Sequence, residues 1–363
     1  MKVGVPKEIK SYESRVGLTP ASVRELVRAG HHVIVQRDAG IDIGFPDSIY
    51  QAAGAHIADA ADAVFATSDM IVKVKEPQPA EIGLLRPGQV LFTYLHLAAD
   101  REQTEGLLRS QAICIAYETV TDADRRLPLL APMSEVAGRL SIQVGAHQLE
   151  RPQGGPGVLL GGVSGVSPAR VLILGGGVAG SNAAQMAVGL GAQVTIIDRS
   201  VARLQMLETQ FAGRVRTLFA TADSIEAEAT SSELVIGAVL IPGAAAPKLL
   251  SRAVIRRMQR GAVLVDISID QGGCFETSRP TTHDRPTFVL DGVIHYCVAN
   301  MPAAVARTAT IALNNATLPY VLELANKGWK RAIDENPHLR NGLNIEAGRI
   351  VHPAVAQSFG EKA

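Results

Sequence analysis

The chain has 363 residues, equal numbers of basic and acidic side chains (35 each) and 47% hydrophobic residues. At about 150 residues per domain this length predicts two or three domains, and the hydrophobic content excludes a largely disordered chain. A nucleic-acid binder that neutralises phosphates would normally carry a basic excess, which this composition lacks. Three scattered cysteines, Cys114, Cys274 and Cys297, fit neither a disulfide framework nor a zinc site, so we expect no metal.

One segment has to be distinguished from a membrane span. Residues 171–197 carry no charge, but they contain six glycines together with several amide and hydroxyl side chains. That composition favours a buried strand–turn–helix–strand over a membrane helix. The first 15 residues contain no apolar stretch of signal-peptide length. We therefore expect a cytoplasmic protein.

The first part of the chain alternates β-rich runs with helical patterns. Thr19, Pro20 and Gly30 mark the clearest helix, as its N-cap, its first position and the residue past its end. Strands alternating with helices of this length imply parallel pairing through crossover helices. The strands predicted here are Lys2–Ile9, His32–Gln36, Asp69–Lys75, Gln89–His96 and Ala112–Thr119.

A second alternating region follows a linker at residues 121–133 and a helix at residues 134–150. A long apolar helix is expected from Ala303 to Lys327, and we expect it to pack back on the first region. The strands predicted in the second region are Arg170–Leu174, Gln193–Asp198, Arg216–Phe219, Leu234–Ala238, Ala262–Asp266 and Val293–Tyr296.

The strongest local motif is a dinucleotide fingerprint. Gly175, Gly177 and Gly180 have the G-x-G-x-x-G spacing between an apolar strand and a helical pattern. The first glycine allows a tight turn, the second lets the backbone approach a pyrophosphate, and the third lets the helix pack closely on the strand. Asp198 ends the next strand, where its carboxylate can bind a ribose diol and repel a 2′-phosphate. The motif favours NAD over NADP, a preference that the adjacent Arg199 weakens slightly.

These patterns predict an α/β fold of two domains, each a mainly parallel sheet with flanking helices. A Rossmann NAD-binding domain (131–302, with the connecting helix 134–150) would be inserted into a discontinuous substrate domain (1–130 and 303–363).

Other candidate residues follow the predicted strands of the second region, where ligands of such sheets bind. Val239 and Leu240 either pack in the core or cover a ring of the cofactor. Asp266 is expected to be structural. Asp270 lies beyond the strand in a glycine-rich turn, where it serves either chemistry or an Asx turn.

The first region offers two lysines and a histidine. Strand periodicity places Lys73 and Lys75 on one strand face, and the next strand ends in His96. Because strand ends of one parallel sheet converge, Lys75 could supply a fixed positive charge beside His96, which could transfer a proton. A half-buried structural histidine is the alternative for His96 considered alone.

Arg15 lies in the loop before the first helix. It could grip a substrate carboxylate through two parallel hydrogen bonds, or it could be a solvated surface side chain. Glu8 and Glu13 are close in sequence, and spacing alone does not rank them.

The motifs together resemble the alanine dehydrogenase family, which is related to the NAD-binding subunit of proton-translocating transhydrogenase. The resemblance implies the two-domain fold described above, NAD as cofactor, usually a homohexamer, and reversible oxidation of L-alanine to pyruvate and ammonium. The matching runs, in order along nearly the whole chain, are VGVPKEIK, ESRVGLTP, IVKVKEP, YLHLA, APMSEVAGRLS, GPGVLLGGVSGV, the fingerprint, GAVLIPG, DISIDQGG and HYCVANMP.

Carried over position by position, the resemblance implies that Arg15 and Lys75 bind the substrate. His96 matches the acid/base residue, Asp270 completes the catalytic site, and Met133 matches the segment lining it. The fingerprint and the resemblance together predict cofactor contacts at Ser134, Gly175, Gly177, Ala179, Gly180, Asp198, Val239, Leu240, Ile267, Asp270, Val298, Asn300 and Met301.

The sequence departs from the family pattern at three positions. Ala303 and Ala306 stand where glycine and proline are expected, and Ala245 stands where lysine is common. The sequence also leaves alternatives open. These are another NAD-dependent amino-acid or oxo-acid dehydrogenase, a non-enzymatic NAD-binding subunit like that of transhydrogenase, and a structural or regulatory protein that retains the fold.

Overall fold

The computed structural model describes residues 1–239 and 246–360, and the expected site residue Leu240 and the departure at Ala245 lie outside them. The chain forms two compact units. Unit 1 comprises Met1–Met133 and the described residues from Val305 onward, and unit 2 comprises Ser134–Ala304. Unit 2 therefore interrupts unit 1 in sequence.

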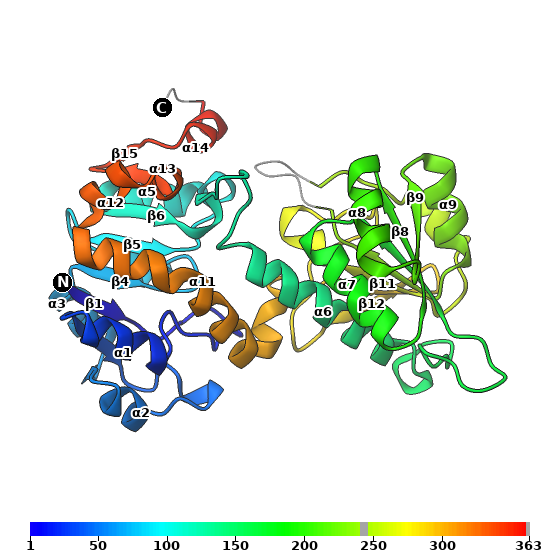
Figure 1. Cartoon of the computed structure of the whole chain (residues 1–363), viewed down its shortest axis with the longest axis horizontal. Helices are drawn as coiled ribbons and strands as arrows, with labels where there is room; N and C mark the ends of the chain where they lie inside the picture. Colours follow the sequence, from blue (N-terminus) through cyan, green and yellow to red (C-terminus); the bar gives the residue numbers. More distant parts are fainter. Residues whose placement is uncertain (240–245, 361–363) are drawn as a thin grey trace. The chain divides into compact units, whose positions relative to one another are not determined.

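Unit 1 is built on an eight-stranded sheet in the order β15-β14-β6-β5-β4-β1-β2-β3 (Figure 1). The strands from β6 to β3 pair in parallel, whereas β14 and β15 are antiparallel. The strands are β1 (Lys2–Val5), β2 (His32–Gln36), β3 (His56–Ala58), β4 (Met70–Val72), β5 (Val90–Thr93), β6 (Ile113–Ala116), β14 (Leu343–Glu346) and β15 (Arg349–Ile350).

Helices connect the strands of unit 1. Those of the first segment are α1 (Pro20–Arg28), α2 (Asp47–Ala52), α3 (Ala61–Thr67), α4 (Pro79–Ile82) and α5 (Arg101–Ser110). Three short 3₁₀ helices accompany them: η1 (Ile41–Ile43), η2 (Leu97–Ala99) and η3 (Tyr117–Thr119). Those of the second segment are α11 (Ala306–Lys327), α12 (Trp329–Glu335), α13 (Pro337–Arg340) and α14 (Pro353–Ser358).

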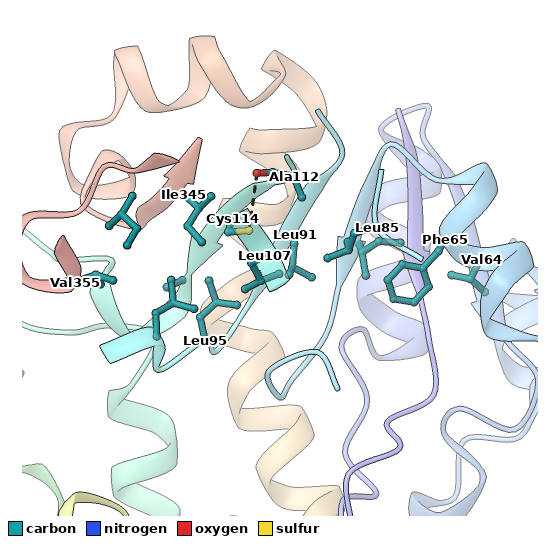
Figure 2. Packing of buried hydrophobic residues seen from close by; sticks show 14 of the residues in the cluster. Val64, Phe65, Leu85, Leu91, Leu95, Leu107, Ala112, Cys114, Ile345 and Val355 are labelled. Atoms are coloured by element: carbon teal, nitrogen blue, oxygen red, sulfur yellow. Dashed lines mark hydrogen bonds between the residues drawn. The ribbon is translucent and has the colours of Figure 1, made fainter. Parts of the chain in front are cut away.

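A hydrophobic row crosses unit 1 perpendicular to its strands. Ile71, Leu91 and Cys114 lie side by side in register on β4, β5 and β6, and Ile345 of β14 continues the row. All four side chains are fully buried in one cluster, together with Leu107 of α5 (Figure 2). Residues more than 200 positions apart thus share one core, which fixes the returning tail on the sheet.

Unit 2 contains a seven-stranded sheet in the order β12-β13-β11-β10-β7-β8-β9. Six strands are parallel, and β12 pairs antiparallel with β13. The order reverses between β7 and β10, where open sheets of this kind bind their ligands. The strands are β7 (Arg170–Leu174), β8 (Gln193–Asp198), β9 (Val215–Phe219), β10 (Leu234–Gly237), β11 (Val263–Asp266), β12 (Thr287–Leu290) and β13 (Val293–Tyr296).

The helices of this part of the chain are α6 (Ala131–Gln148), which starts at the end of unit 1, α7 (Val178–Gly189), α8 (Val201–Phe211), α9 (Ala222–Ser231) and α10 (Arg252–Ile255), with short η4 (Arg151–Gln153), η5 (Ile267–Gln271) and η6 (Met301–Val305). Among the helices of residues 1–239 and 246–360, none is both long and apolar enough to cross a membrane.

The predicted fold class, two mainly parallel sheets with flanking helices, is confirmed. Thr19 caps α1 by accepting a hydrogen bond from the Ser22 N–H, as its position predicted. The prediction that Lys73 and Lys75 lie on one strand face was wrong, because β4 ends at Val72. The long helix α11 begins at Ala306 rather than Ala303, which lies in η6.

A buried amide ties the loop before α1 to α11. Asn314 Oδ1 accepts hydrogen bonds from the Thr19 N–H (2.7 Å) and the Ser22 hydroxyl (3.0 Å), and its Nδ2 donates to the Thr310 carbonyl (3.1 Å). Its side chain joins two segments of unit 1 that are almost 300 residues apart in sequence.

We predict that Asn314→Ala lowers the stability of unit 1 by about 2–3 kcal/mol, because it leaves a buried backbone N–H without an acceptor. The adjacent Asn315 is exposed on the same helix, so Asn315→Ala should change stability by less than about 0.5 kcal/mol. Thermal and urea unfolding of both variants provide the measurement. Equal destabilisation by the two substitutions would show that the Asn314 contacts contribute nothing specific.

Candidate active site

The candidate site residues of unit 1 lie at one edge of its sheet. Adjacent parallel strands β6, β5, β4 and β1 end there, and the loops that follow them carry the candidate side chains. Arg15 lies in the loop after β1, Lys75 follows β4, and His96 follows β5. The convergence of strand ends expected from the sequence is therefore present within this unit.

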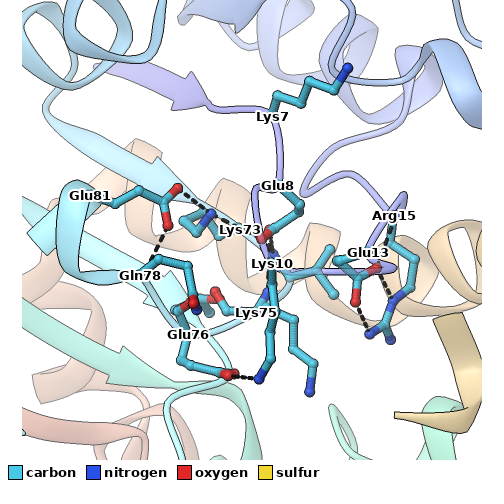
Figure 3. Close-up of polar contacts among 12 residues, drawn as sticks. Lys7, Glu8, Lys10, Glu13, Arg15, Lys73, Lys75, Glu76, Gln78 and Glu81 are labelled. Carbon is cyan, nitrogen blue, oxygen red and sulfur yellow. Dashed lines mark hydrogen bonds and ion pairs between the residues drawn. The ribbon is translucent and has the colours of Figure 1, made fainter. Parts of the chain in front are cut away.

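A buried acid–lysine–acid cluster, formed by Glu8, Lys73 and Glu81, lies beneath this edge (Figure 3). The fully buried Lys73 Nζ lies 3.0 Å from Glu8 Oε2 and 2.6 Å from Glu81 Oε1. Burial lowers the pKa of Lys73, but the two carboxylates outweigh it and raise that pKa above its ordinary value. Burial also raises the pKa of Glu8, against the attraction of Lys73. Lys73 is thus a structural cation, whereas Lys75 is partly exposed.

Arg15 is buried rather than solvated, and its side chain is 2% exposed. Its guanidinium forms two parallel hydrogen bonds with Glu13, from Nε to Oε1 (2.7 Å) and from Nη2 to Oε2 (2.6 Å). Nη1 lies 3.1 Å from Met133 Sδ. Burial lowers the pKa of Arg15, but the hydrogen bonds and charge of Glu13 raise it above its ordinary value. The two parallel hydrogen bonds that the sequence analysis considered for a substrate carboxylate are made here with the Glu13 carboxylate. Glu13 thereby fixes the position of the Arg15 guanidinium.

His96 has a left-handed backbone, with φ 51° and ψ 38°. Glu118, in the turn after β6, accepts a hydrogen bond from the His96 N–H at 2.6 Å, and its Oε1 lies 3.8 Å from His96 Nδ1. The imidazole stacks parallel to the Tyr94 ring at 5.8 Å between centroids, and 48% of the side chain is exposed. A held but accessible imidazole can exchange protons with a bound molecule.

Sequence patterns did not single out Glu118 or Tyr94. The one available signal was position, because each follows a strand that ends at the same edge as the strands before Arg15 and Lys75. Tyr94 is buried, and burial raises the pKa of its hydroxyl, which donates to the Leu129 carbonyl. It therefore serves as a neutral platform for His96.

In unit 2 the glycine fingerprint has the geometry that its spacing predicted. Gly175 has φ 98°, a conformation that glycine adopts readily. A Cβ on Gly180 would lie 1.8 Å from the Gly175 carbonyl oxygen, whereas one on Gly177 would meet no atom within 4 Å. Gly177 is the N-cap residue of the 12-residue helix α7, and no side chain caps the first N–H groups of that helix. That arrangement fits a pyrophosphate.

Two further predicted residues lie near this turn. Gly138 of α6 packs so closely on α7 that a Cβ there would lie 2.1 Å from the Ala179 carbonyl oxygen, and Ser134 lies one turn earlier on α6. Ser134, on α6, therefore lies near the N-terminal end of α7, which carries Ala179.

Asp198 ends β8 and holds the glycine turn. Its Oδ2 accepts a hydrogen bond from the Gly176 N–H (2.7 Å), and its Oδ1 accepts one from the Ser200 N–H (2.8 Å). Arg203, which the sequence did not indicate, donates from Nε to the Gly176 carbonyl at 2.6 Å. An acid and a base from neighbouring elements thus flank the turn that would hold the cofactor.

The turn after β11 is organised by Asp266. This buried carboxylate accepts hydrogen bonds from the Ser268 N–H (3.0 Å), the Cys274 N–H (2.9 Å) and the Ser278 hydroxyl (2.5 Å). Burial raises its pKa against these hydrogen bonds. Asp266 is thus structural, as expected.

Asp270 is exposed on the turn that Asp266 organises, and the structure brings it to a second predicted residue. Its Oδ1 accepts a hydrogen bond from the Asn300 N–H at 3.3 Å. Val239 is tied to the same turn, because its backbone N–H and carbonyl both bond Ser268 Oγ. The loops after β10, β11 and β13 therefore form one connected edge.

The remaining predicted residues differ in exposure. Val298 and Met301 are buried within unit 2, so their side chains pack in its core, whereas Ile267 is partly exposed. Within residues 1–239 and 246–360 no group of three His, Cys, Asp or Glu side chains is arranged to hold a metal ion.

We predict that Gly180→Ala weakens NADH binding by about tenfold or more, because a methyl group there forces α7 away from the glycine turn. Gly189→Ala is the matched control on the same helix, since its Cβ would meet nothing within 4 Å. Titration of NADH fluorescence measures both affinities. Unchanged NADH affinity of the Gly180 variant would show that NADH binding does not depend on the close helix–strand contact.

Two segments of the chain match models of one protein family. Residues 4–137 match "Alanine dehydrogenase/PNT, N-terminal domain", and residues 141–353 match "Alanine dehydrogenase/PNT, C-terminal domain". The chain is 58% identical to an alanine dehydrogenase of Halomonas elongata and 54% identical to one of Mycobacterium tuberculosis, each over 99% of this chain and 97% of the relative.

Solved structures give the same result. A solved structure of an L-alanine dehydrogenase is 56% identical and superposes with a TM-score of 0.96, with 99% of both chains covered. A transhydrogenase from Sinorhizobium meliloti shares the fold at 24% identity, with a TM-score of 0.83 over 98% of this chain and 100% of that one. The chain belongs to the alanine dehydrogenase/PNT family.

Proposed function

We propose that this protein is an NAD-dependent L-alanine dehydrogenase. In the oxidative direction L-alanine, NAD⁺ and water give pyruvate, ammonium, NADH and a proton, and the reverse direction aminates pyruvate. The observation that carries the proposal is the gathering of Arg15, Lys75 and His96 at one sheet edge of unit 1, in a chain whose other unit has the dinucleotide turn. The Lys75 ammonium group, the Arg15 guanidinium held by Glu13 and the His96 imidazole suit a 2-oxo acid.

The residues of unit 2 fit NAD. The N-terminus of α7, which no side chain caps, suits the pyrophosphate, and Asp198 at the end of β8 suits an unphosphorylated ribose, because its charge would repel a 2′-phosphate. The expected contacts at Val239, Ile267 and Asn300 remain part of this proposal. When bound, the cofactor supplies or accepts a hydride at the nicotinamide.

Unit 1 provides the charges for the substrate. Lys75 binds the carboxylate and the carbonyl oxygen of pyruvate, and Arg15 adds a fixed positive charge that Glu13 holds in place. Polarisation of the carbonyl assists attack by ammonia at the carbonyl carbon. Asp270 of unit 2 completes the catalytic set in this proposal.

His96 transfers protons. It gives a proton to the hydroxyl that leaves as water when the imine forms, and in the opposite direction it takes a proton from the attacking water. Glu118 fixes the backbone that presents the imidazole, and Tyr94 fixes its ring plane. Restricting the imidazole in this way reduces the entropy lost on reaching the reactive arrangement.

The assignment of substrate binding to unit 1 and NAD binding to unit 2 is part of the same proposal. A homohexameric state and a cytoplasmic location are further proposals that rest on the resemblance to the family.

The direct test follows NADH absorbance with pyruvate and ammonium. We expect NADH oxidation to require both, and NADPH and glyoxylate to serve less well. NADH oxidation by pyruvate without ammonium would contradict the proposal and indicate a hydroxy-acid dehydrogenase. NADH binding without any turnover would indicate a binding subunit.

The same assay tests His96. His96→Ala should lower turnover by about 100-fold or more while NADH affinity stays unchanged, since general acid–base catalysis contributes at least this much. His56→Ala, which alters an exposed histidine on β3 of the same sheet, is the control and should retain wild-type turnover.

A further inference from the structure

The segment that carries Lys75 is not part of a regular strand, yet its backbone is held throughout. β4 ends at Val72, so residues 73–75 lie beyond the regular strand. Their backbone groups are bonded partly by the neighbouring chain segment at β5 and partly by side chains. The Lys73 N–H donates to the Phe92 carbonyl (3.2 Å), and the Val74 carbonyl accepts from the Tyr94 N–H (3.3 Å). The Lys73 carbonyl accepts from the Tyr117 hydroxyl (3.0 Å).

The three remaining backbone groups are held by two side chains. Glu8 Oε1 accepts from the Val74 N–H at 2.7 Å and from the Lys75 N–H at 3.3 Å. The Thr93 hydroxyl donates to the Lys75 carbonyl at 2.9 Å. Every backbone polar group of residues 73–75 therefore has a partner, and Glu8 alone satisfies two of them.

Glu8 can do this as a carboxylate because Lys73 neutralises its other oxygen. Oε2 lies 3.0 Å from Lys73 Nζ, while Oε1 bonds the two N–H groups. A glutamine could not serve both sides, because its amide has one acceptor oxygen and one donor nitrogen. Whichever way it turned, a donor would face a donor.

We propose that Glu8 is a positioning residue for the substrate lysine, acting with Thr93 as a clamp on the backbone of residues 73–75. The inference rests on the proposed function, in which Lys75 binds pyruvate. Glu8 makes no contact with substrate in this scheme. It fixes the backbone position from which the Lys75 side chain extends. The Lys75 ammonium group can then reach pyruvate without further ordering of the loop.

Glu81 is a matched control within the same cluster. It also bridges Lys73 Nζ (2.6 Å) and a backbone N–H (2.8 Å), but that N–H belongs to Gln78, at the start of α4. Glu8→Gln and Glu81→Gln therefore remove the same charge from the same lysine and create the same donor conflict. They differ in which backbone is released.

The experiment compares the two variants in the pyruvate amination assay, with NADH affinity and thermal stability measured in parallel. Glu8→Gln should raise the KM for pyruvate by about tenfold or more, as expected for loss of a hydrogen bond to a charged group. Glu81→Gln should leave that KM within about twofold at a similar loss of stability. Both should bind NADH normally. Amide exchange at residues 74 and 75 should accelerate in the Glu8 variant alone.

Equal pyruvate KM values in the two variants would overturn the inference while leaving the proposed function intact. A wild-type enzyme that does not turn over pyruvate with ammonium would overturn the proposed function and the inference with it. If Glu8→Gln does not fold, Thr93→Val tests the other arm of the clamp without altering the charged cluster. It should raise the pyruvate KM by roughly fivefold, the effect of a neutral hydrogen bond, and an unchanged KM would overturn the inference.

Discussion

The cost of burying ionised side chains is the constraint on which the candidate substrate edge depends. A charged group removed from water is destabilising by several kcal/mol unless partners replace the lost hydration. Unit 1 buries Lys73 between Glu8 and Glu81, and it buries Arg15 against Glu13. Several of these carboxylates also accept backbone N–H groups, so the contacts that satisfy the charges fix the loops as well.

Unit 2 uses a related arrangement with a different donor set. Like Glu8, the buried Asp266 carboxylate accepts hydrogen bonds from backbone N–H groups. Its further partner is the Ser278 hydroxyl, whereas that of Glu8 is the Lys73 ammonium group. The turn that it organises carries Asp270. In both units the residues proposed to act on ligands lie on loops after parallel strands, and buried acids determine the shape of these loops. This explains how irregular segments can hold side chains as firmly as regular elements do.

Much of the fold could be predicted from the sequence. The predicted bounds of the strands Arg170–Leu174 and Gln193–Asp198, which are rich in β-branched residues, agree with the structure, and the capping residues located α1. Short strands such as β3 and β14 lack such runs and were missed. The predicted end of β4 was too late, because alternating valines and lysines continue the strand pattern to Lys75. In the structure the regular strand ends at Val72, and the Lys73 side chain is buried between Glu8 and Glu81. Glu8 and Lys73 are 65 positions apart, and no local pattern indicates a pair at that separation.

The most direct measurement is a crystal structure of the full chain with pyruvate bound. We predict that the pyruvate carboxylate lies within hydrogen-bonding distance of Lys75 Nζ, while Glu8 still bridges Lys73 and the backbone of residues 74 and 75. Pyruvate bound away from Lys75, or a Glu8 carboxylate rotated off that backbone in the complex, would contradict this prediction.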